Sequence, residues 1–207
     1  MVTSLLSESD AREVEAAIGR VERATAAEVV VAVVAQSAEH WRGRVAVAGI
    51  WSIATALSVL HYLPRERAAL AFLAQVAAFF VAYSVLGARP ILRWFVAPRA
   101  AAQASHARAF QLFAERGLHR TKTRSAVLIF VSELERRVVL LGDAGIHAEL
   151  GQRGWEVQVE LLLKRIRERH LREGLLEVLA ELEPRLAAVA PHQPDDENEL
   201  PDSVLRE

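Results

Sequence analysis

Two long uncharged segments constrain the fold of this 207-residue chain more than any other feature. Residues 45–63 form a run of 19 residues, and residues 68–88 a run of 21, without a formally charged side chain. At about 1.5 Å per helical residue, each run is about 28 to 32 Å long and matches the hydrocarbon core of a bilayer. Soluble helices rarely lack a charged face over two successive lengths, so the runs predict a transmembrane hairpin; the alternative is a buried hairpin in a soluble core.

Features flanking the two runs fit this interpretation. The connection 64–67 contains a proline and three charges, which suits a turn at a membrane interface, and Tyr62 and Trp94 are placed to act as interfacial anchors. Five arginines flank the hairpin on its outer sides and two lie in the connection: Arg42, Arg44, Arg89, Arg93 and Arg99 against Arg65 and Arg67. The excess of positive charge predicts a multi-pass protein with both termini in the cytoplasm.

Composition and missing motifs exclude several functions. A formal net charge of −1 gives no long-range attraction to nucleic acid, so no nucleic-acid partner is expected. The absence of cysteine excludes zinc ribbons, thiol redox chemistry, cysteine nucleophiles and disulfides. The sequence also lacks the phosphate-binding, dinucleotide-binding, serine-esterase and HExxH zinc motifs.

Hydrophobic spacing predicts the elements on either side of the hairpin. Residues 7–25 form a helix whose Ser7 and Asp10 resemble a capping box, and residues 28–35 form a buried strand. Residues 98–117 form a helix with Ala107, Phe110 and Phe113 on one side. Strands 126–131 and 136–141 form a β-hairpin. Two helices follow, whose apolar residues recur at helical spacing from Trp155 and from Leu175. An acidic tail begins at Pro191.

These elements predict a small α/β sandwich with a central sheet, interrupted by a two-helix transmembrane hairpin. The expected divisions are 1–44 and 96–190 for the two parts of the sandwich, 45–95 for the hairpin (spans 45–63 and 68–88) and 191–207 for the tail.

Several stretches resemble the TPM-domain family of thylakoid lumen, photosystem-repair and acetylcholine-receptor-modulator proteins. They are TAAEVVVAVV (25–34), RSAVLIFVSELERRVVLLGDAGI (124–146), Trp155, GLLEVL (174–179) and ENELPDSV (197–204). More narrowly, the chain resembles the bacterial membrane-protein branch. The resemblance implies an α/β sandwich with a central sheet. We expect the chain to lie in a bacterial inner membrane. The resemblance further implies acid phosphatase activity, divalent-cation binding, or a role in assembly or repair of membrane complexes.

One candidate site is a pair of carboxylates. Asp143 matches the family's aspartate after the second hairpin strand, and Glu28 and Glu149 are its candidate co-ligands for Ca²⁺ or Mg²⁺. The alternatives are an Asx-type turn for Asp143 and a solvated strand edge for Glu28. The chain carries Ser125-Ala126 where a typical member has Asn-Gly or Thr-Gly, which removes ligand oxygens or turn glycines near the presumed metal site.

A second candidate site is a basic loop that would hold an anion, a lipid headgroup or an acidic partner. Its members are Arg116, His119, Arg120, Lys122 and Arg124. Arginine offers paired donors to oxyanions, although such a loop can also be simply solvated.

The sequence therefore favours a membrane-anchored, non-catalytic interaction or assembly module, with a metal-assisted acid phosphatase using Asp143 as the alternative. The interaction or assembly module requires no cofactor. The expected partners are the lipid bilayer and another membrane protein or complex.

Overall fold

The chain divides into two compact units, residues 1–37 with 101–207 and residues 38–100. The computed structural model describes residues 6–62, 64, 68–88, 91–92, 94, 96–121, 124–192 and 204–206, without the side chains of 68, 144, 147–150, 152 and 206. The first unit is called the α/β unit below and the second the helical unit.

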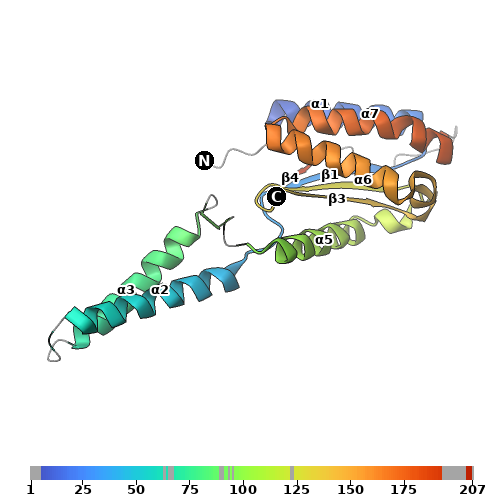
Figure 1. Ribbon diagram of the computed structural model, residues 1–207. Helices are drawn as coiled ribbons and strands as arrows, with labels where there is room; N and C mark the ends of the chain where they lie inside the picture. Colours follow the sequence, from blue (N-terminus) through green and yellow to red (C-terminus); the bar gives the residue numbers. More distant parts are fainter. Residues whose placement is uncertain are drawn as a thin grey trace. The chain divides into compact units, whose positions relative to one another are not determined.

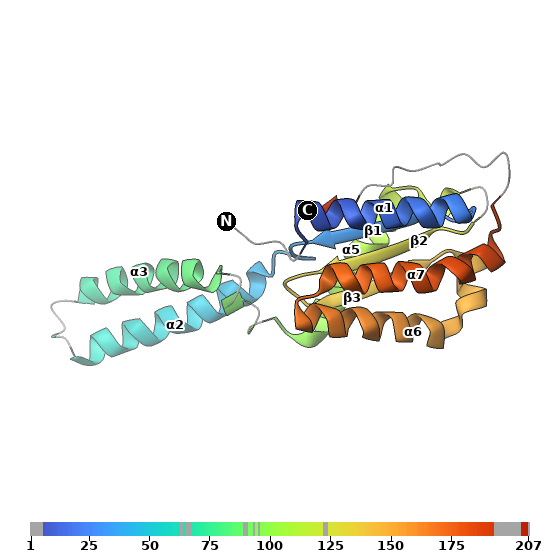
Figure 2. The same cartoon turned by 90° about the horizontal axis from the view of Figure 1, so that it is seen from above.

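The α/β unit is built on a four-stranded mixed sheet of order β3-β2-β1-β4. β1 pairs in parallel with β2 and β4, whereas β2 and β3 are antiparallel. The strands are β1 (Val29–Val34), β2 (Val127–Ser132), β3 (Arg137–Gly142) and β4 (Leu205–Arg206). Helices α1 (Glu8–Ala24), α6 (Ala144–Glu168) and α7 (Leu171–Val189) cover one face, and α5 (Pro98–Glu115) covers the other (Figures 1 and 2). The α/β class predicted from the sequence is confirmed.

Burial on both faces explains why the central strands are apolar throughout. In β1, Val29, Val31 and Val33 join the core beneath α1, α6 and α7. Val30 and Val34 face the other way and pack with residues of α5. A strand covered on both sides reads as a continuous hydrophobic run, as in VVVAVV.

Helix α1 begins at the predicted capping box. The Asp10 backbone N–H donates to Ser7 Oγ at 3.1 Å, and the Ser7 N–H donates to Asp10 Oδ2 at 3.1 Å. Arg172 on α7 lies 3.2 Å from the Glu13 carboxylate of α1, so charged pairs border the apolar contact between the two helices.

The side of α5 that carries Ala107 and Phe110 does not face the sheet. Its buried residues are Ala101, Ser105, Ala109 and Leu112, whereas the Phe110 side chain is 61% exposed. Phe113 is partly buried and packs against this core, whereas Phe110 lies on the outer side of the helix.

The C-terminal end of the chain returns to the sheet. β4 pairs with Ala32 and Val33 of β1, and Val204 is buried with its N–H donating to Glu15 Oε1 at 3.1 Å. The sequence predicted only a tail here, because a two-residue strand has no detectable periodicity. Most of the ENELPDSV segment lies outside the described residues.

The helical unit contains α2 (Trp41–Tyr62) and α3 (Ala68–Leu86), and both α2 and residues 69–86 of α3 are long and apolar enough to cross a membrane. Small residues are buried in this unit: Ala48, Ser52 and Ala71. Large apolar side chains point outward, including Ile50, Leu57, Phe72 and Phe80, each more than 60% exposed. Residues 65–67 of the predicted connection lie outside the described part of the chain.

Hydroxyl groups of α2 bond within their own helix. Ser52, Thr55 and Ser58 donate to the carbonyls of Gly49, Trp51 and Ala54 at 2.8 to 3.2 Å. Arg44 donates to the Tyr83 carbonyl at 2.9 Å, and its guanidinium lies 4.1 Å from the centre of the Tyr83 ring. The three hydroxyl groups are therefore compatible with an apolar surrounding.

Candidate functional site

The two candidate metal ligands lie at the same end of the sheet. The Val127 N–H donates to the Glu28 carbonyl at 2.8 Å, and the Asp143 N–H donates to the Ala126 carbonyl at 2.9 Å. Glu28, Ala126 and Asp143 thus form one row across the ends of β1, β2 and β3. Because neighbouring strands are about 4.8 Å apart, the backbones of Glu28 and Asp143 are about 10 Å apart.

Both carboxylates are partly shielded from solvent. Glu28 is only 8% exposed, so it is not a solvated edge residue, and one carboxylate oxygen of each residue is buried. Ala126 contributes only a methyl group between them. The row therefore places two acidic side chains on either side of a small residue, within a protected end of the sheet.

Asp143 also has a local structural position. It immediately precedes α6, and its carbonyl accepts the Ile146 N–H at 3.1 Å. An aspartate at a helix start is favoured by the helix dipole and by the free N–H groups of the first turn. The turn expected in GDAGI is thus the junction between β3 and α6. A carboxylate at this position stabilises the start of the helix without binding any ligand.

The neighbouring Gly142 allows Trp155 to pack against β3. A Cβ atom at position 142 would lie 2.6 Å from a ring carbon of Trp155, which is closer than real contacts allow. Trp155 is 6% exposed and belongs to the main core. Gly142 is therefore required by its packing against Trp155, whereas Asp143 is favoured by its place at the helix start.

The basic loop leads into the same end of the sheet. Gly117 (φ 69°) ends α5, the short 3-10 helix η2 (Leu118–Arg120) follows, and Arg124 (φ 49°) precedes β2. The predicted members with described positions, Arg116, His119, Arg120 and Arg124, are exposed. Arg120 Nε lies 3.2 Å from His119 Nε2. Lys122 lies outside the described residues.

The fold thus brings both predicted sets to one end of the sheet, but the carboxylates alone form a poor metal site. Among the described residues, no group of three or more potential His, Asp or Glu ligands is found. A divalent calcium ion needs six to eight oxygens, and two carboxylates supply at most four. The side chain of Glu149 is outside the described part of the structure.

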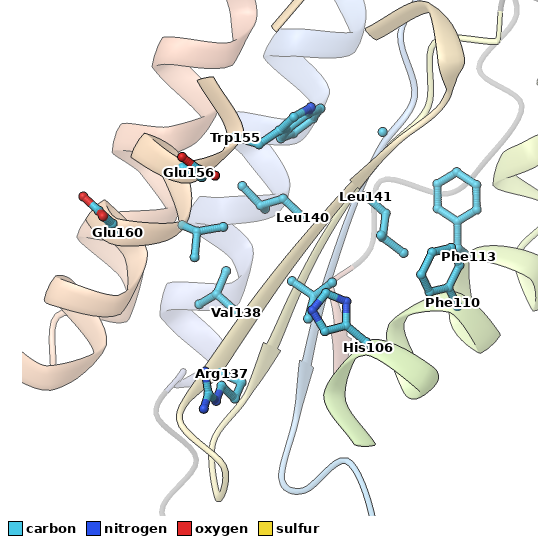
Figure 3. A pocket seen from close by; sticks show the side chains of 13 residues that line it. His106, Phe110, Phe113, Arg137, Val138, Leu140, Leu141, Trp155, Glu156 and Glu160 are labelled. Carbon is cyan, nitrogen blue, oxygen red and sulfur yellow. The ribbon is translucent and has the colours of Figure 1, made fainter. Parts of the chain in front are cut away.

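A groove that the sequence did not reveal runs along the free edge of β3 (Figure 3). Its volume is about 630 Å³. Trp155, Glu156, Val159 and Glu160 of α6 form one wall, and His106, Phe110 and Phe113 of α5 form the other. Residues of β3 form its floor. The groove was hard to predict from the sequence, because the pattern of residues in α5 does not show whether Phe110 faces a core or an open groove.

Comparisons with known proteins support the fold and do not assign a family. No protein-family model and no curated protein matches the chain. The NMR structure of the BA42 protein from the psychrophilic bacterium Bizionia argentinensis is similar, with a TM-score of 0.62 and 16% sequence identity. The similarity covers 100% of this chain and 99% of that one. At this identity the likeness concerns the fold alone.

Proposed function

We propose that this chain is a membrane-anchored, TPM-like α/β domain that acts as a non-catalytic interaction module in the assembly or repair of membrane complexes. The observation that carries the proposal is the groove of about 630 Å³ along the free edge of β3, whose walls include the outward Phe110. An open groove with apolar walls beside a sheet edge favours binding of another protein.

The helical unit supplies the membrane anchor in this proposal. Its large apolar side chains point outward and its small residues inward, the arrangement expected where lipid replaces water around the helices. The protein then resides in the bacterial inner membrane as a multi-pass protein, with both termini in the cytoplasm as the arginine distribution predicts. Its partners are the bilayer and another membrane protein.

Site-specific photo-cross-linking in native membranes tests the interaction. A photoreactive phenylalanine replaces Phe110 in the groove wall or, as a control, Val157, which lies on α6 outside the groove and is 52% exposed. The proposal predicts an adduct of one discrete mass from position 110 and none from position 157. Equal adducts from both positions, or none from either, contradict it.

Metal-assisted acid phosphatase activity is the second candidate, favoured by the convergence of Glu28, Asp143 and the basic loop at one end of the sheet. The full chain in lipid nanodiscs is assayed with para-nitrophenyl phosphate, with and without Ca²⁺ or Mg²⁺. The interaction proposal predicts no metal-dependent turnover. Turnover that Asp143→Asn abolishes would establish the phosphatase instead.

A further inference from the structure

We infer that the β3 groove binds an extended polypeptide strand with basic side chains at every second position and apolar side chains between them. The inference rests on the proposed function, since it specifies how the interaction module recognises its partner. It is carried by three features of the α/β unit: the orientation of the β3 backbone, the two apolar walls and the acidic rim on α6.

The β3 backbone offers hydrogen-bonding groups to an added strand. In an antiparallel ladder, hydrogen-bonded pairs alternate along the strands. Because the Asp143 N–H bonds to Ala126, residues 141, 139 and 137 share its orientation toward β2. Val138, Leu140 and Gly142 therefore direct their N–H and C=O groups to the free edge, and no strand among the described residues pairs there.

This edge lacks the usual protection against pairing. Edge strands are commonly blunted by charged side chains, prolines or bulges. Residues 138–142 of β3 contain no charge and no proline, and the register with β2 is continuous over the whole strand. Arg137, at the start of β3, is the strand's one charged residue. The edge can thus accept a partner strand along most of its length.

The two walls differ in a way that specifies the occupant. On the α5 side, Phe110 and Phe113 provide an apolar surface next to Leu141. On the α6 side, Trp155 lies beside Leu140, and Glu156 and Glu160 lie along the same helix (Figure 3). Apolar side chains fit the first wall. Lysine or arginine fits the second, because the stem covers apolar surface while the charged end reaches the carboxylates.

A second copy of this chain does not fit the same edge. If two β3 strands extended one sheet across a twofold axis, the two α6 helices would lie on the same face of that sheet. Glu156 and Glu160 of one copy would then face those of the other, which is unfavourable. A separate extended strand brings no helix of its own and carries complementary charge.

Labelled peptides provide the test. The full chain in phosphatidylcholine nanodiscs is titrated into a fluorescein-labelled peptide of four Lys-Val repeats, and anisotropy is measured against empty nanodiscs. Saturable binding is expected for this peptide, whereas the matched Glu-Val peptide binds at least about tenfold more weakly because rim charges select the partner. Equal binding of the two peptides, or no saturable binding, overturns the inference.

Backbone methylation distinguishes strand addition from charge attraction. Two further peptides carry N-methyl groups on all lysines or on all valines. An added strand presents only alternate N–H groups to its neighbour, so one peptide loses binding and the other retains it. Retention by both, or loss by both, contradicts strand addition.

Surface variants locate the binding site. Replacing Glu156 and Glu160 by lysine is expected to weaken binding of the Lys-Val peptide about tenfold, while Glu168→Lys, on the same helix outside the groove, leaves it unchanged. An equal effect of both changes overturns the assignment to the groove. If no peptide binds but the photo-cross-linked adduct at position 110 still forms, strand addition is wrong and the proposed interaction module is retained. If that adduct is absent as well, the proposed function also fails.

Discussion

At the residue scale, the contact between Gly142 and Trp155 links the GDAGI sequence to the fold. The sequence suggested a carboxylate at a strand end, whereas the geometry shows that the glycine beside it is equally constrained. Such a constraint was not predictable, because Trp155 is thirteen positions away and its approach depends on how α6 crosses β3.

Gly142→Ala is expected to lower the free energy of unfolding of the α/β unit by about 1 to 3 kcal/mol, because the added methyl collides with the Trp155 ring. Chemical denaturation followed by circular dichroism measures this loss. Gly49→Ala is the matched control, since a Cβ atom at that position meets nothing within 4 Å. Equal stability of Gly142→Ala and the wild type would show that Trp155 does not pack as described.

Asp10 makes the stability of α1 depend on pH. Hydrogen bonds from the Ser7 hydroxyl and backbone N–H lower the pKa of the Asp10 carboxyl below its usual value. A carboxyl group whose pKa is lower in the folded than in the unfolded state stabilises the fold at pH values above its unfolded pKa. This stabilisation is lost as the pH falls through the folded pKa.

Asp10→Asn should therefore reduce the free energy of unfolding at pH 7, by less than about 1 kcal/mol because solvent reaches the partly exposed carboxylate. The difference from the wild type should shrink from about pH 5 downward. Denaturation at a series of pH values measures it. A difference that grows as the pH falls would contradict the assigned direction of the pKa shift.

Sequence periodicity located the helices and the three longer strands, but it did not predict that α6 begins at Ala144 and is broken at Gly151. The capping box placed the start of α1 within a residue, and β-branched runs placed β1, β2 and β3 within about one residue of their ends. Two features depended on tertiary packing instead. α5 buries small residues rather than Phe110, and β4 exists only because β1 offers it an edge.

Deleting residues 204–207 is expected to expose one edge of β1. Without β4, the N–H groups of β1 that face it lose their partners, and burial of the Val204 side chain is lost as well. Hydrogen exchange followed by mass spectrometry should show faster exchange in peptides covering β1. Peptides covering β3, at the opposite edge, serve as the internal control; the same increase there would indicate general unfolding rather than loss of a strand.

Across the whole molecule, the two units differ in the side chains that they expose. The α/β unit buries its large apolar side chains in two cores, whereas the helical unit presents such side chains outward. The sequence predicted this contrast from charge alone, because the absence of charged residues over both runs leaves no face suited to water. The partner's identity was not predictable, since the groove exists only where α5, β3 and α6 pack around one edge of the sheet.

Cysteine labelling measures whether α2 and α3 anchor the chain in a membrane. The natural chain has no cysteine, so Leu57→Cys, Phe72→Cys and Ala180→Cys each carry one thiol. Leu57 and Phe72 are 63% and 65% exposed in the protein alone, and Ala180 is an exposed residue of α7.

Sonicated native membranes, with both faces accessible, are treated with a water-soluble maleimide that does not cross lipid. Rapid labelling is expected at position 180, and labelling at positions 57 and 72 only after denaturation in sodium dodecyl sulfate, because lipid covers those side chains. Labelling of positions 57 and 72 as fast as position 180 would show that the helices lie in water and do not anchor the chain in a membrane.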